Sequence, residues 1–457
     1  MLDNANKYKE LREKYKTFIY EDFKVIDDKE EIILEYYFKI DDLEEFKPQI
    51  KIPKKDYIIN EKIQFSDSFA FHIGMIELIS YWKCTCSPNV VIKCGNLNEE
   101  QITWFKKLYF YGLGELFFTN NIKSQLSDFM NITCISNKDM NFKTDDEQKY
   151  SGYIFPIGGG KDSCVTIETL KELSTNNYCL IVNPKPVTLE CARIAGYSEN
   201  KIISVQRKID TRLIELNNKG FINGHTPFSS LLAFVTYYLA FLTGKKYIAL
   251  SNEVSSNESN VVGEKINHQY SKSLEFENDF RYYVKKYIKS PIEYFSFLRP
   301  LNELQIASIF SKLEQYHNIF KSCNQGSKEQ VWKWCCNCPK CMFVYIILSP
   351  FLYKEKLLNI FGEDLYERKD LLKTFIELTG NGDTKPFECV GTFEEVCFAI
   401  TKTISNLEKK GKVLPYMLQY YKDNFKLSDL SNDLTELFNE DNNLTKEQEE
   451  ILKAKLN

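Results

Sequence analysis

Between Tyr153 and Ser251 the chain alternates short apolar segments with longer helical ones, and this alternation limits the possible folds more than any other feature. The segments typical of buried strands are YIFPI, YCLIV, KIISV and KKYIALS, and the helical stretches between them include VTIETLKEL and PFSSLLAFVTYYLAFLTG. Strands that alternate with helices form parallel sheets covered by helices on both faces. The sequence therefore predicts an α/β protein built on a parallel sheet.

A run of three glycines follows the first of these strands, in FPIGGGKDSCVTIETLKEL. Gly158, Gly159 and Gly160 would form the turn, and a helix would begin near Asp162. Glycine allows positive φ and lets a ligand approach the backbone. The first N–H groups of the helix are unpaired and lie at the positive end of its dipole. The segment predicts an anion site, with the alternative that it is only a glycine turn capped by Asp162 or Ser163.

The spacing of this loop distinguishes it from other phosphate-binding loops. The Walker pattern needs two glycines separated by four residues, and the dinucleotide-binding pattern needs spaced glycines. The segment instead resembles the PP-loop of ATP pyrophosphatases, SGGxDS, with Gly158 in the place of the first serine. The resemblance implies that ATP is split between its α- and β-phosphates and that the loop holds pyrophosphate. Asp162 would hold Mg²⁺, Ser163 would donate to a phosphate oxygen, and Lys161 would neutralise charge on the leaving phosphates.

Polar residues follow a later predicted strand, YIALS. Ser251, Asn252 and Glu253 come directly after it. In open α/β sheets ligands collect at the carboxyl ends of the strands, so we expect this loop and the glycine loop to open onto one crevice. Two of the four histidines of the chain, His225 and His268, flank this region. Histidine titrates near neutral pH and serves as a general acid or base, although a single histidine is more often structural.

Five cysteines lie within 19 residues, in SCNQGSKEQVWKWCCNCPKC. Cys335, Cys338 and Cys341 have the spacing C-x2-C-x2-C, and Cys323 can supply a fourth thiolate. Four thiolates form a closed tetrahedral site, which is typical of structural Zn²⁺. The alternatives are an iron–sulfur cluster, which uses similar spacing, and a set of reduced cysteines without a metal. The long interval before the triplet favours zinc, and it leaves Cys336 as a spare thiol or a substitute for Cys335.

A PP-loop followed by such a cysteine cluster is similar to 7-cyano-7-deazaguanine synthase, but this chain is much longer. Segments from about His72 to Gly391 resemble, in order, the UDP-N-acetylmuramoyl-L-alanyl-L-glutamate epimerases: FHIGMIELISYWK, YGLGE, PIGGGKDS, NGHTPFS, SNE, NHQYSKSLEFE, SCN, CPKCMFV, LSPFL, NIFGEDL and KPFECVG. The resemblance implies a cytoplasmic enzyme of bacterial peptidoglycan synthesis and cell-shape maintenance. It also implies a HUP-like core of the adenine nucleotide alpha hydrolase type. Cys336 departs from the family pattern, which has glycine there.

The resemblance implies an ATP-dependent epimerisation of the terminal L-glutamate of UDP-MurNAc-L-Ala-L-Glu. The α-proton is hard to remove beside a carboxylate, because a second negative charge would develop on the same atoms. Converting the carboxylate to an acyl adenylate cancels its charge, and a positioned base then adds roughly 10²–10⁴-fold. The candidate catalytic residues are Lys161, Asp162, Ser163, Glu253, His268 and Cys389, with His225 and Glu388 as further proton-transfer candidates. The candidate nucleotide-binding residues are Gly158, Gly159, Gly160, Lys161, Asp162, Ser163, Ser251 and Asn252.

Some residues near these motifs have simpler explanations. His72 lies in an apolar helix and is expected to be a packed core residue. Cys389 is as readily explained by burial as by catalysis, since a reactive cysteine needs an environment that lowers its pKa. Lys265, Lys272 and Arg299 are possible partners for the charges of the substrate, although a solvated surface position is the commoner role for such residues.

Four parts are expected along the chain: an N-terminal α+β domain (1–148), a PP-loop ATP-binding domain (149–310), a helical domain with the cysteine cluster (311–425) and a polar, loosely attached helical tail (426–457). The charged start lacks the apolar stretch of an export signal, and CMFVYIILSPFLY is too short to span a bilayer. A net charge of −4 argues against a dedicated nucleic-acid binder. The expected partners are a UDP-linked muramyl dipeptide and ATP, with Mg²⁺ and structural Zn²⁺ as cofactors, and with neither nucleic acid nor membrane.

Two rival functions remain open. A PP-loop ligase of the deazaguanine synthase type would also adenylate a carboxylate, but it would then attach nitrogen. A non-catalytic nucleotide-binding component of a larger assembly would retain the fold without the reaction. A tRNA-modifying role is a further possibility that the acidic balance of charges disfavours.

Overall fold

The computed structural model describes residues 4–55, 58, 60–142, 149–261, 266–323, 325, 333–382 and 385–456. Lys265, one of the possible charge partners of the substrate, lies outside these ranges. Within them, no helix combines the length and the apolar composition that a membrane crossing requires.

The described strands form an eleven-stranded sheet, ordered β11-β10-β7-β8-β9-β4-β2-β1-β5-β6, with β3 paired to β2. The predicted strands are confirmed, and β7 and β10 are parallel neighbours. Antiparallel pairing of β9 with β4 joins them to N-terminal strands, which sequence periodicity alone does not reveal. The strands are β1 Thr17–Asp27, β2 Glu31–Ile40, β3 Glu44–Phe46, β4 Gln49–Pro53, β5 Asn89–Ile92, β6 Asn131–Cys134, β7 Tyr153–Pro156, β8 Tyr178–Val182, β9 Ile202–Lys208, β10 Tyr247–Leu250 and β11 Glu293–Ser296.

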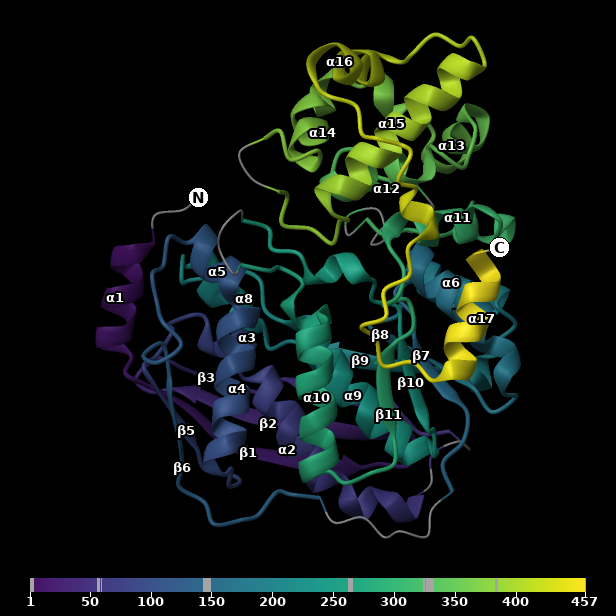
Figure 1. The fold of residues 1–457 in the computed structure, drawn as a ribbon. Helices are drawn as coiled ribbons and strands as arrows, with labels where there is room; N and C mark the ends of the chain where they lie inside the picture. Colours follow the sequence, from purple (N-terminus) through teal and green to yellow (C-terminus); the bar gives the residue numbers. More distant parts are fainter. Residues whose placement is uncertain are drawn as a thin grey trace. The chain divides into compact units, whose positions relative to one another are not determined.

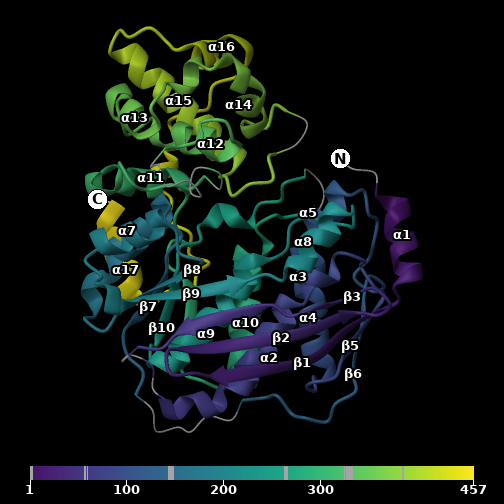
Figure 2. The same cartoon turned by 180° about the vertical axis from the view of Figure 1, so that it is seen from behind.

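The helices confirm the mixed α/β class (Figures 1 and 2). Glycine supplies the left-handed C-cap where α9 ends, with φ of 65° at Gly244. The α-helices are α1 Ala5–Lys14, α2 Ser66–Glu77, α3 Ile79–Trp82, α4 Glu99–Gly112, α5 Gly114–Thr119, α6 Lys161–Leu170, α7 Pro186–Ile194, α8 Thr211–Asn218, α9 Phe228–Thr243, α10 Leu274–Tyr287, α11 Glu303–Ser311, α12 Pro339–Leu348, α13 Lys354–Phe361, α14 Leu372–Leu378, α15 Phe393–Lys409, α16 Tyr416–Asn424 and α17 Lys446–Leu456.

Two compact units divide the chain, and unit 1 comprises Met1–Ile154, Ile203–Ile248 and Lys265–Tyr294. Its β1 and β2 pair as a long antiparallel hairpin, and alternate residues of β2 are buried. Helix α2 packs on this hairpin so closely that a Cβ at Gly74 would lie 2.0 Å from the Tyr20 hydroxyl oxygen. His72 on α2 is fully buried, which confirms it as a core residue.

Unit 2 comprises Phe155–Ile202, Ala249–Glu264 and Phe295–Asn457. Helices α12 to α16 gather into one helical group within it (Figure 1). The predicted loose attachment of the tail is wrong, because α17 packs against α6 and α11 and fully buries Leu452. The chain before α17 is also held, since Asn302 Nδ2 donates to the Leu434 carbonyl over 2.6 Å. The four-part division expected from the sequence is finer than these two units and stays a prediction.

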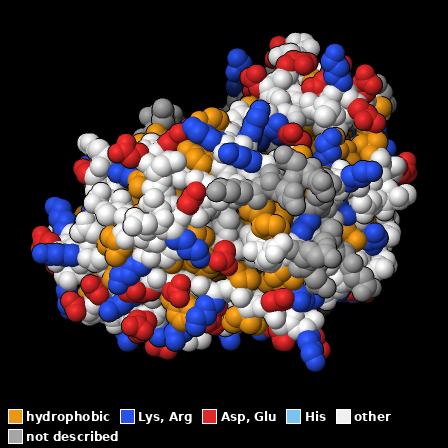
Figure 3. All heavy atoms as spheres, turned by 90° about the horizontal axis from the view of Figure 1, so that it is seen from below, with side chains coloured by type: hydrophobic (Ala, Val, Ile, Leu, Met, Phe, Trp, Pro, Cys, Tyr) orange, Lys and Arg blue, Asp and Glu red, His pale blue; other side chains and the backbone are white. Residues whose placement is uncertain are grey.

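The surface carries charges of both signs. On the face drawn in Figure 3, lysine and arginine side chains are interspersed with aspartate and glutamate. That distribution agrees with the near-balance of 59 basic and 63 acidic residues in the whole chain.

Candidate functional site

The glycine loop of unit 2 needs two of its three glycines for steric reasons. Gly159 has φ of +79°, which side chains rarely adopt, and its Cβ would lie 3.3 Å from the Val187 side chain. A Cβ at Gly160 would lie 2.8 Å from Ser322 Oγ. A Cβ at Gly158 would meet nothing within 4 Å, so this residue faces open space. Neighbouring side chains therefore pack against the loop at Gly159 and Gly160, whereas no described side chain packs against it at Gly158.

Helix α6 begins directly after this loop, with Gly160 as its N-cap. Gly160 carries no side chain, so the N-cap position offers no side-chain acceptor to the first backbone N–H groups of the helix. The Ser163 hydroxyl donates to the Gly160 carbonyl over 3.0 Å, so its proton is directed at the protein backbone. An anion at the start of the helix would then be bound mainly by backbone N–H groups. A glycine turn leading into a helix N-terminus is a suitable site for a phosphate group.

Lys161 is almost completely buried and pairs with two carboxylates. Its Nζ donates to Asp162 Oδ1 over 2.5 Å and also to Glu303 Oε2. Burial disfavours the charge on the amine, but Asp162 and Glu303 outweigh burial and raise its pKa. The Lys161 charge is therefore directed at protein carboxylates, whereas the motif predicts that it faces the leaving phosphates.

Glu303 is a member of this site that the sequence analysis missed. Burial raises its pKa against the opposing effect of Lys161, and the nearby charges of Asp162 and Glu253 act in the same direction as burial. The backbone N–H of Glu303 donates to Glu395 Oε1 over 2.9 Å. The local sequence shows only a capping box at the start of α11. A capping box does not indicate that the glutamate in the first turn is buried.

The loop after β10 lies in the same unit, and an arginine holds it in place. Arg299 is fully buried and donates to the Glu253 carbonyl and to Ser256 Oγ, each over 2.7 Å. The surface role expected for Arg299 is therefore wrong. Asn252 Nδ2 donates to Ser296 Oγ over 2.9 Å.

Ser251 differs from its neighbours in the loop. Its Oγ is buried and has no hydrogen-bond partner among the described residues. A buried hydroxyl without a partner costs free energy. A polar ligand at the carboxyl end of β10 would satisfy it.

The segment KPFECVG packs against both of these regions of unit 2. Asn260 Nδ2 donates to the Pro386 carbonyl over 3.2 Å, which ties the segment to the loop after β10. A Cβ at Gly391 would lie 3.1 Å from Glu303 Cγ, so the segment also reaches the Lys161 cluster. Cys389, two residues before Gly391, is half-buried.

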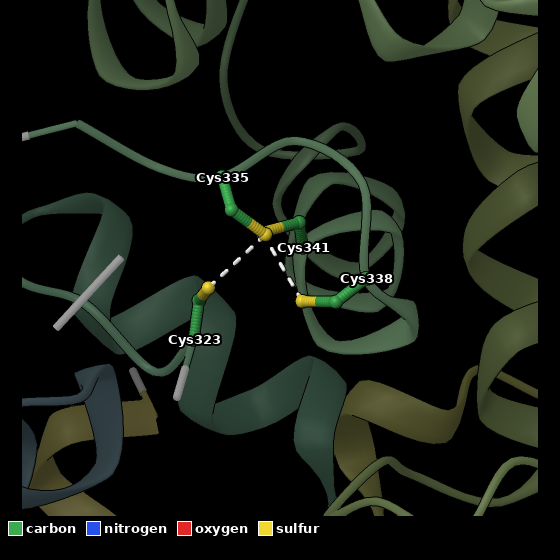
Figure 4. Close-up of side chains that lie close together, drawn as sticks. All are labelled: Cys323, Cys335, Cys338 and Cys341. Atoms are coloured by element: carbon green, nitrogen blue, oxygen red, sulfur yellow. Dashed lines mark hydrogen bonds between the residues drawn. The ribbon is translucent and has the colours of Figure 1, made fainter. Parts of the chain in front are cut away.

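The four predicted cysteine ligands come together in unit 2, with their sulfur atoms within 4.8 Å of one another (Figure 4). Cys323 Sγ is 3.3 Å from Cys335 Sγ, and Cys341 Sγ is 3.5 Å from the sulfurs of Cys335 and Cys338. Thiolates around one Zn²⁺ at about 2.3 Å would have similar separations. This quartet could hold a metal ion.

Cys336 does not join this quartet. Its thiol is buried and donates to the Phe361 carbonyl over 3.3 Å. Its φ of +53° is in the left-handed region that favours glycine. The backbone therefore has the conformation that a glycine would adopt most easily, at a position where the resemblance to the family implies glycine.

A second cluster of ligand-type side chains lies in unit 1. Glu115 Oε2 contacts Nδ1 of His268 and lies 3.8 Å from Nδ1 of His225. Burial, together with the positive charges of His268, Lys272 and Lys83, lowers the pKa of His225 to about 3. Glu115 was not a candidate in the sequence analysis, although it ends the YGLGE segment.

The sequence candidates thus fall into two groups. Unit 2 contains all the candidate nucleotide-binding residues, the cysteine quartet, Glu253 and Cys389, whereas His225 and His268 belong to unit 1.

Comparison with known protein families accounts for most of the chain. Residues 9–297 match the model of the MurL N-terminal domain, and residues 319–428 match the model of the MurL C-terminal domain. The chain belongs to the MurL family. Both matched regions include residues of the candidate site, since 9–297 contains the glycine loop and 319–428 contains the cysteine quartet.

Relatives within this family carry one name, UDP-N-acetyl-alpha-D-muramoyl-L-alanyl-L-glutamate epimerase. The protein of Xanthomonas oryzae pv. oryzae is 32% identical over 345 residues, covering 74% of this chain and 75% of the relative. Those of a Micromonospora species and of Salinispora tropica are each 32% identical over 334 residues. These alignments cover 72% of this chain and 73% and 71% of the relatives.

Proposed function

We propose that the protein converts the terminal L-glutamate of UDP-MurNAc-L-Ala-L-Glu to D-glutamate, in an ATP-dependent reaction that releases AMP and pyrophosphate. The names of the relatives support the epimerisation and its substrate. The observation that supports adenylation is the start of α6 directly after a glycine loop, together with the loop after β10, in which Ser251 Oγ has no hydrogen-bond partner among the described residues. A PP-loop ATP-binding core is part of this proposal.

Adenylation solves the problem of acidity at the α-carbon. A carboxylate oxygen of the substrate attacks the α-phosphorus of ATP, and the bond to the β-phosphate oxygen breaks, so pyrophosphate leaves with its charge. The resulting acyl adenylate no longer carries the carboxylate charge beside the α-carbon. A base removes the α-proton, a proton returns from the opposite face, and water then hydrolyses the adenylate to carboxylate and AMP.

The glycine loop and the α6 N-terminus would receive the pyrophosphate, because backbone N–H groups and the helix dipole favour an anion there. Asp162 has a quarter of its side-chain surface exposed and would hold Mg²⁺, which supplies charge neutralisation when bound. Ser251 and Asn252 would contact the nucleotide from the loop after β10. Lys161 acts as a positioning residue that keeps Asp162 and Glu303 in place.

Two residues of unit 2 are the proposed proton-transfer groups, Glu253 and Cys389. Glu253 is buried, with Ser255 Oγ 3.3 Å from its Oε1, and Cys389 lies in the segment that packs against Glu303. The third candidate, His268, lies in unit 1, where a carboxylate and a second imidazole are its neighbours. The cysteine quartet is proposed to hold a structural Zn²⁺ that ties Cys323 to the start of α12.

The test is the Asp162→Asn variant in heavy water. We expect the wild-type protein with ATP and the L-glutamyl substrate to form AMP and to incorporate deuterium at the glutamate α-carbon. Asp162→Asn should reduce AMP formation and deuterium incorporation together, by roughly 10²–10³-fold as for loss of an electrostatic stabiliser. Asp67→Asn is a matched control, because Asp67 is also a first-turn aspartate but lies on α2.

Other results of the same experiment would indicate one of the alternative functions. AMP formation with consumption of ammonia and without deuterium at the α-carbon would identify a ligase. ATP binding without AMP formation from any glutamyl substrate would identify a non-catalytic nucleotide-binding component. Epimerisation by Asp162→Asn at the wild-type rate would refute the assignment of the glycine loop.

A further inference from the structure

Two of the four histidines of the chain, His225 and His268, lie next to Glu115 in unit 1. Glu115 lies on α5, His225 lies in the loop before α9, and His268 lies in the turn before the 3₁₀ segment Tyr270–Lys272. One ligand atom from each of the three lies within 4.8 Å of the others. The two imidazole rings have centroids 4.2 Å apart. Three segments distant in sequence therefore converge on one small volume.

We propose that Glu115, His225 and His268 hold a divalent transition-metal ion, with Zn²⁺ as the best match to this donor set. Imidazole nitrogen and carboxylate oxygen are common zinc ligands, at about 2.0–2.2 Å from the ion. Ligand atoms at that distance around a tetrahedral ion lie about 3.4 Å apart. Both imidazoles present Nδ1 toward Glu115 Oε2, one in direct contact and the other at 3.8 Å. Side-chain movements on the order of 1 Å would bring the three atoms to this spacing.

The number and type of the ligands distinguish this site from the cysteine quartet. Three protein ligands leave an open position on a tetrahedral ion, as in zinc sites that bind water or substrate. The three side chains keep 17%, 25% and 15% of their surface exposed, so none of them is fully buried. The quartet supplies four thiolates and leaves no position open.

Positive charge near the site determines which kind of fourth ligand the metal ion would prefer. Lys83 Nζ donates to the carbonyl of Gly224, the residue before His225, over 2.9 Å. Lys83 and Lys272 both act electrostatically on His225. Two neutral imidazoles and one carboxylate leave a divalent ion with a net positive charge, to which these lysines add. An anionic group, such as a carboxylate or a phosphate oxygen, is therefore the preferred fourth ligand.

The competing explanation is a hydrogen-bonded cluster without metal, in which Glu115 accepts a proton from each imidazole. The variant His268→Asn separates the two explanations. Its side-chain amide would place a donor near the position of Nδ1, so a hydrogen bond to Glu115 would survive, but an amide is a poor zinc ligand. Glu115→Gln removes the ligand charge with little change in shape. His317→Asn, in unit 2, is the control for loss of a histidine.

The experiment is a titration of the chelator-stripped, reduced full chain with Co²⁺ in place of zinc. Thiolate ligation produces sulfur-to-cobalt charge transfer in the near ultraviolet and so reports on the cysteine quartet alone. We expect an additional equivalent of Co²⁺ that absorbs in the visible region without this charge transfer. His268→Asn and Glu115→Gln should each weaken that equivalent by roughly 100-fold or more and leave the charge-transfer band unchanged.

Two results would overturn the proposal. One is a wild-type titration without any cobalt equivalent free of thiolate absorption. The other is such an equivalent that persists at wild-type affinity in His268→Asn and Glu115→Gln. Because the readout is metal binding in unit 1, neither result depends on the reaction proposed above.

Discussion

Cys336 has a backbone conformation that a cysteine adopts at a cost. A φ of +53° costs a residue with a side chain roughly 1–2 kcal/mol relative to glycine. Glycine would relieve this strain, but it would remove the buried thiol. It would also lower the free energy of unfolding by about 0.5–1 kcal/mol, because glycine makes the unfolded chain more flexible. Alanine would keep the strain and lose the thiol. We therefore expect Cys336→Gly to be more stable than Cys336→Ala by about 0.5–1 kcal/mol in denaturant unfolding.

Cys397 provides the matched control, because it is half-buried within helix α15. There glycine should be less stable than alanine by about 1 kcal/mol, since glycine disfavours a helix interior. If glycine is the weaker substitution at both positions, the strain at Cys336 does not contribute to stability.

At the level of single residues, the sequence predicts which side chains can do chemistry, but it does not predict which other side chains they contact. It predicted the cysteine quartet correctly as a set of neighbours, because its spacing is local apart from Cys323. It could not show that Lys161 is buried against Glu303, which lies 142 positions away. Burial of a lysine is decided by tertiary packing, and lysine is mostly exposed in proteins.

Helix α17 shows how an element can be misjudged from composition. Its polar, acidic sequence suggested a loose tail, yet it buries Gln448 and fully buries Leu452 in unit 2. One well-placed leucine can attach an otherwise polar helix, since burying it removes its apolar surface from water. We expect Leu452→Ala to lower the free energy of unfolding by about 2–4 kcal/mol.

Lys455→Ala is the control for this prediction, because Lys455 is exposed on the same helix. It should change stability by less than about 0.5 kcal/mol. Equal and small effects of the two substitutions in urea unfolding would restore the view of a loosely attached tail.

Elements with strong local patterns were predicted with the right type. The strands β7 to β10 and the helix α9 are apolar runs of the expected length, and the glycine loop lies between a strand and a helix as its motif requires. The pairing of β4 with β9 was not predictable in the same way. It joins residues more than 150 positions apart, and no local periodicity records which strand edges meet.

At the scale of the whole molecule, unit 1 is assembled from three separate stretches of chain, and His72 lies among side chains from all of them. Its ring centroid is 6.3 Å from that of Phe234 and 5.7 Å from that of Tyr283. The four-part division expected from the sequence, which stays a prediction, follows the chain in order, whereas the two compact units do not. Discontinuous units are set by contacts between distant residues, which composition and spacing do not encode.

The burial of His72 makes the stability of unit 1 dependent on pH. Burial lowers the pKa of His72 to about 4, against a smaller opposing effect of its hydrogen bond to the Ser68 carbonyl. Below pH 6.5 the unfolded chain takes up a proton that the folded chain does not bind, so stability must fall as the pH falls from about 6.5 to about 4. At 1.36 kcal/mol per pH unit, the loss at pH 5 is about 2 kcal/mol.

The variant His72→Gln should be less stable than the wild type at pH 7.5, because it repacks a fully buried site. Its stability should nevertheless fall by about 2 kcal/mol less between pH 7.5 and pH 5, because the group that takes up the proton is gone. Ile73→Val is a control that destabilises the same buried helix by about 1 kcal/mol without removing a titratable group. Urea unfolding at the two pH values measures both changes. An unchanged pH dependence in His72→Gln would show that the acid sensitivity of the fold arises from other groups.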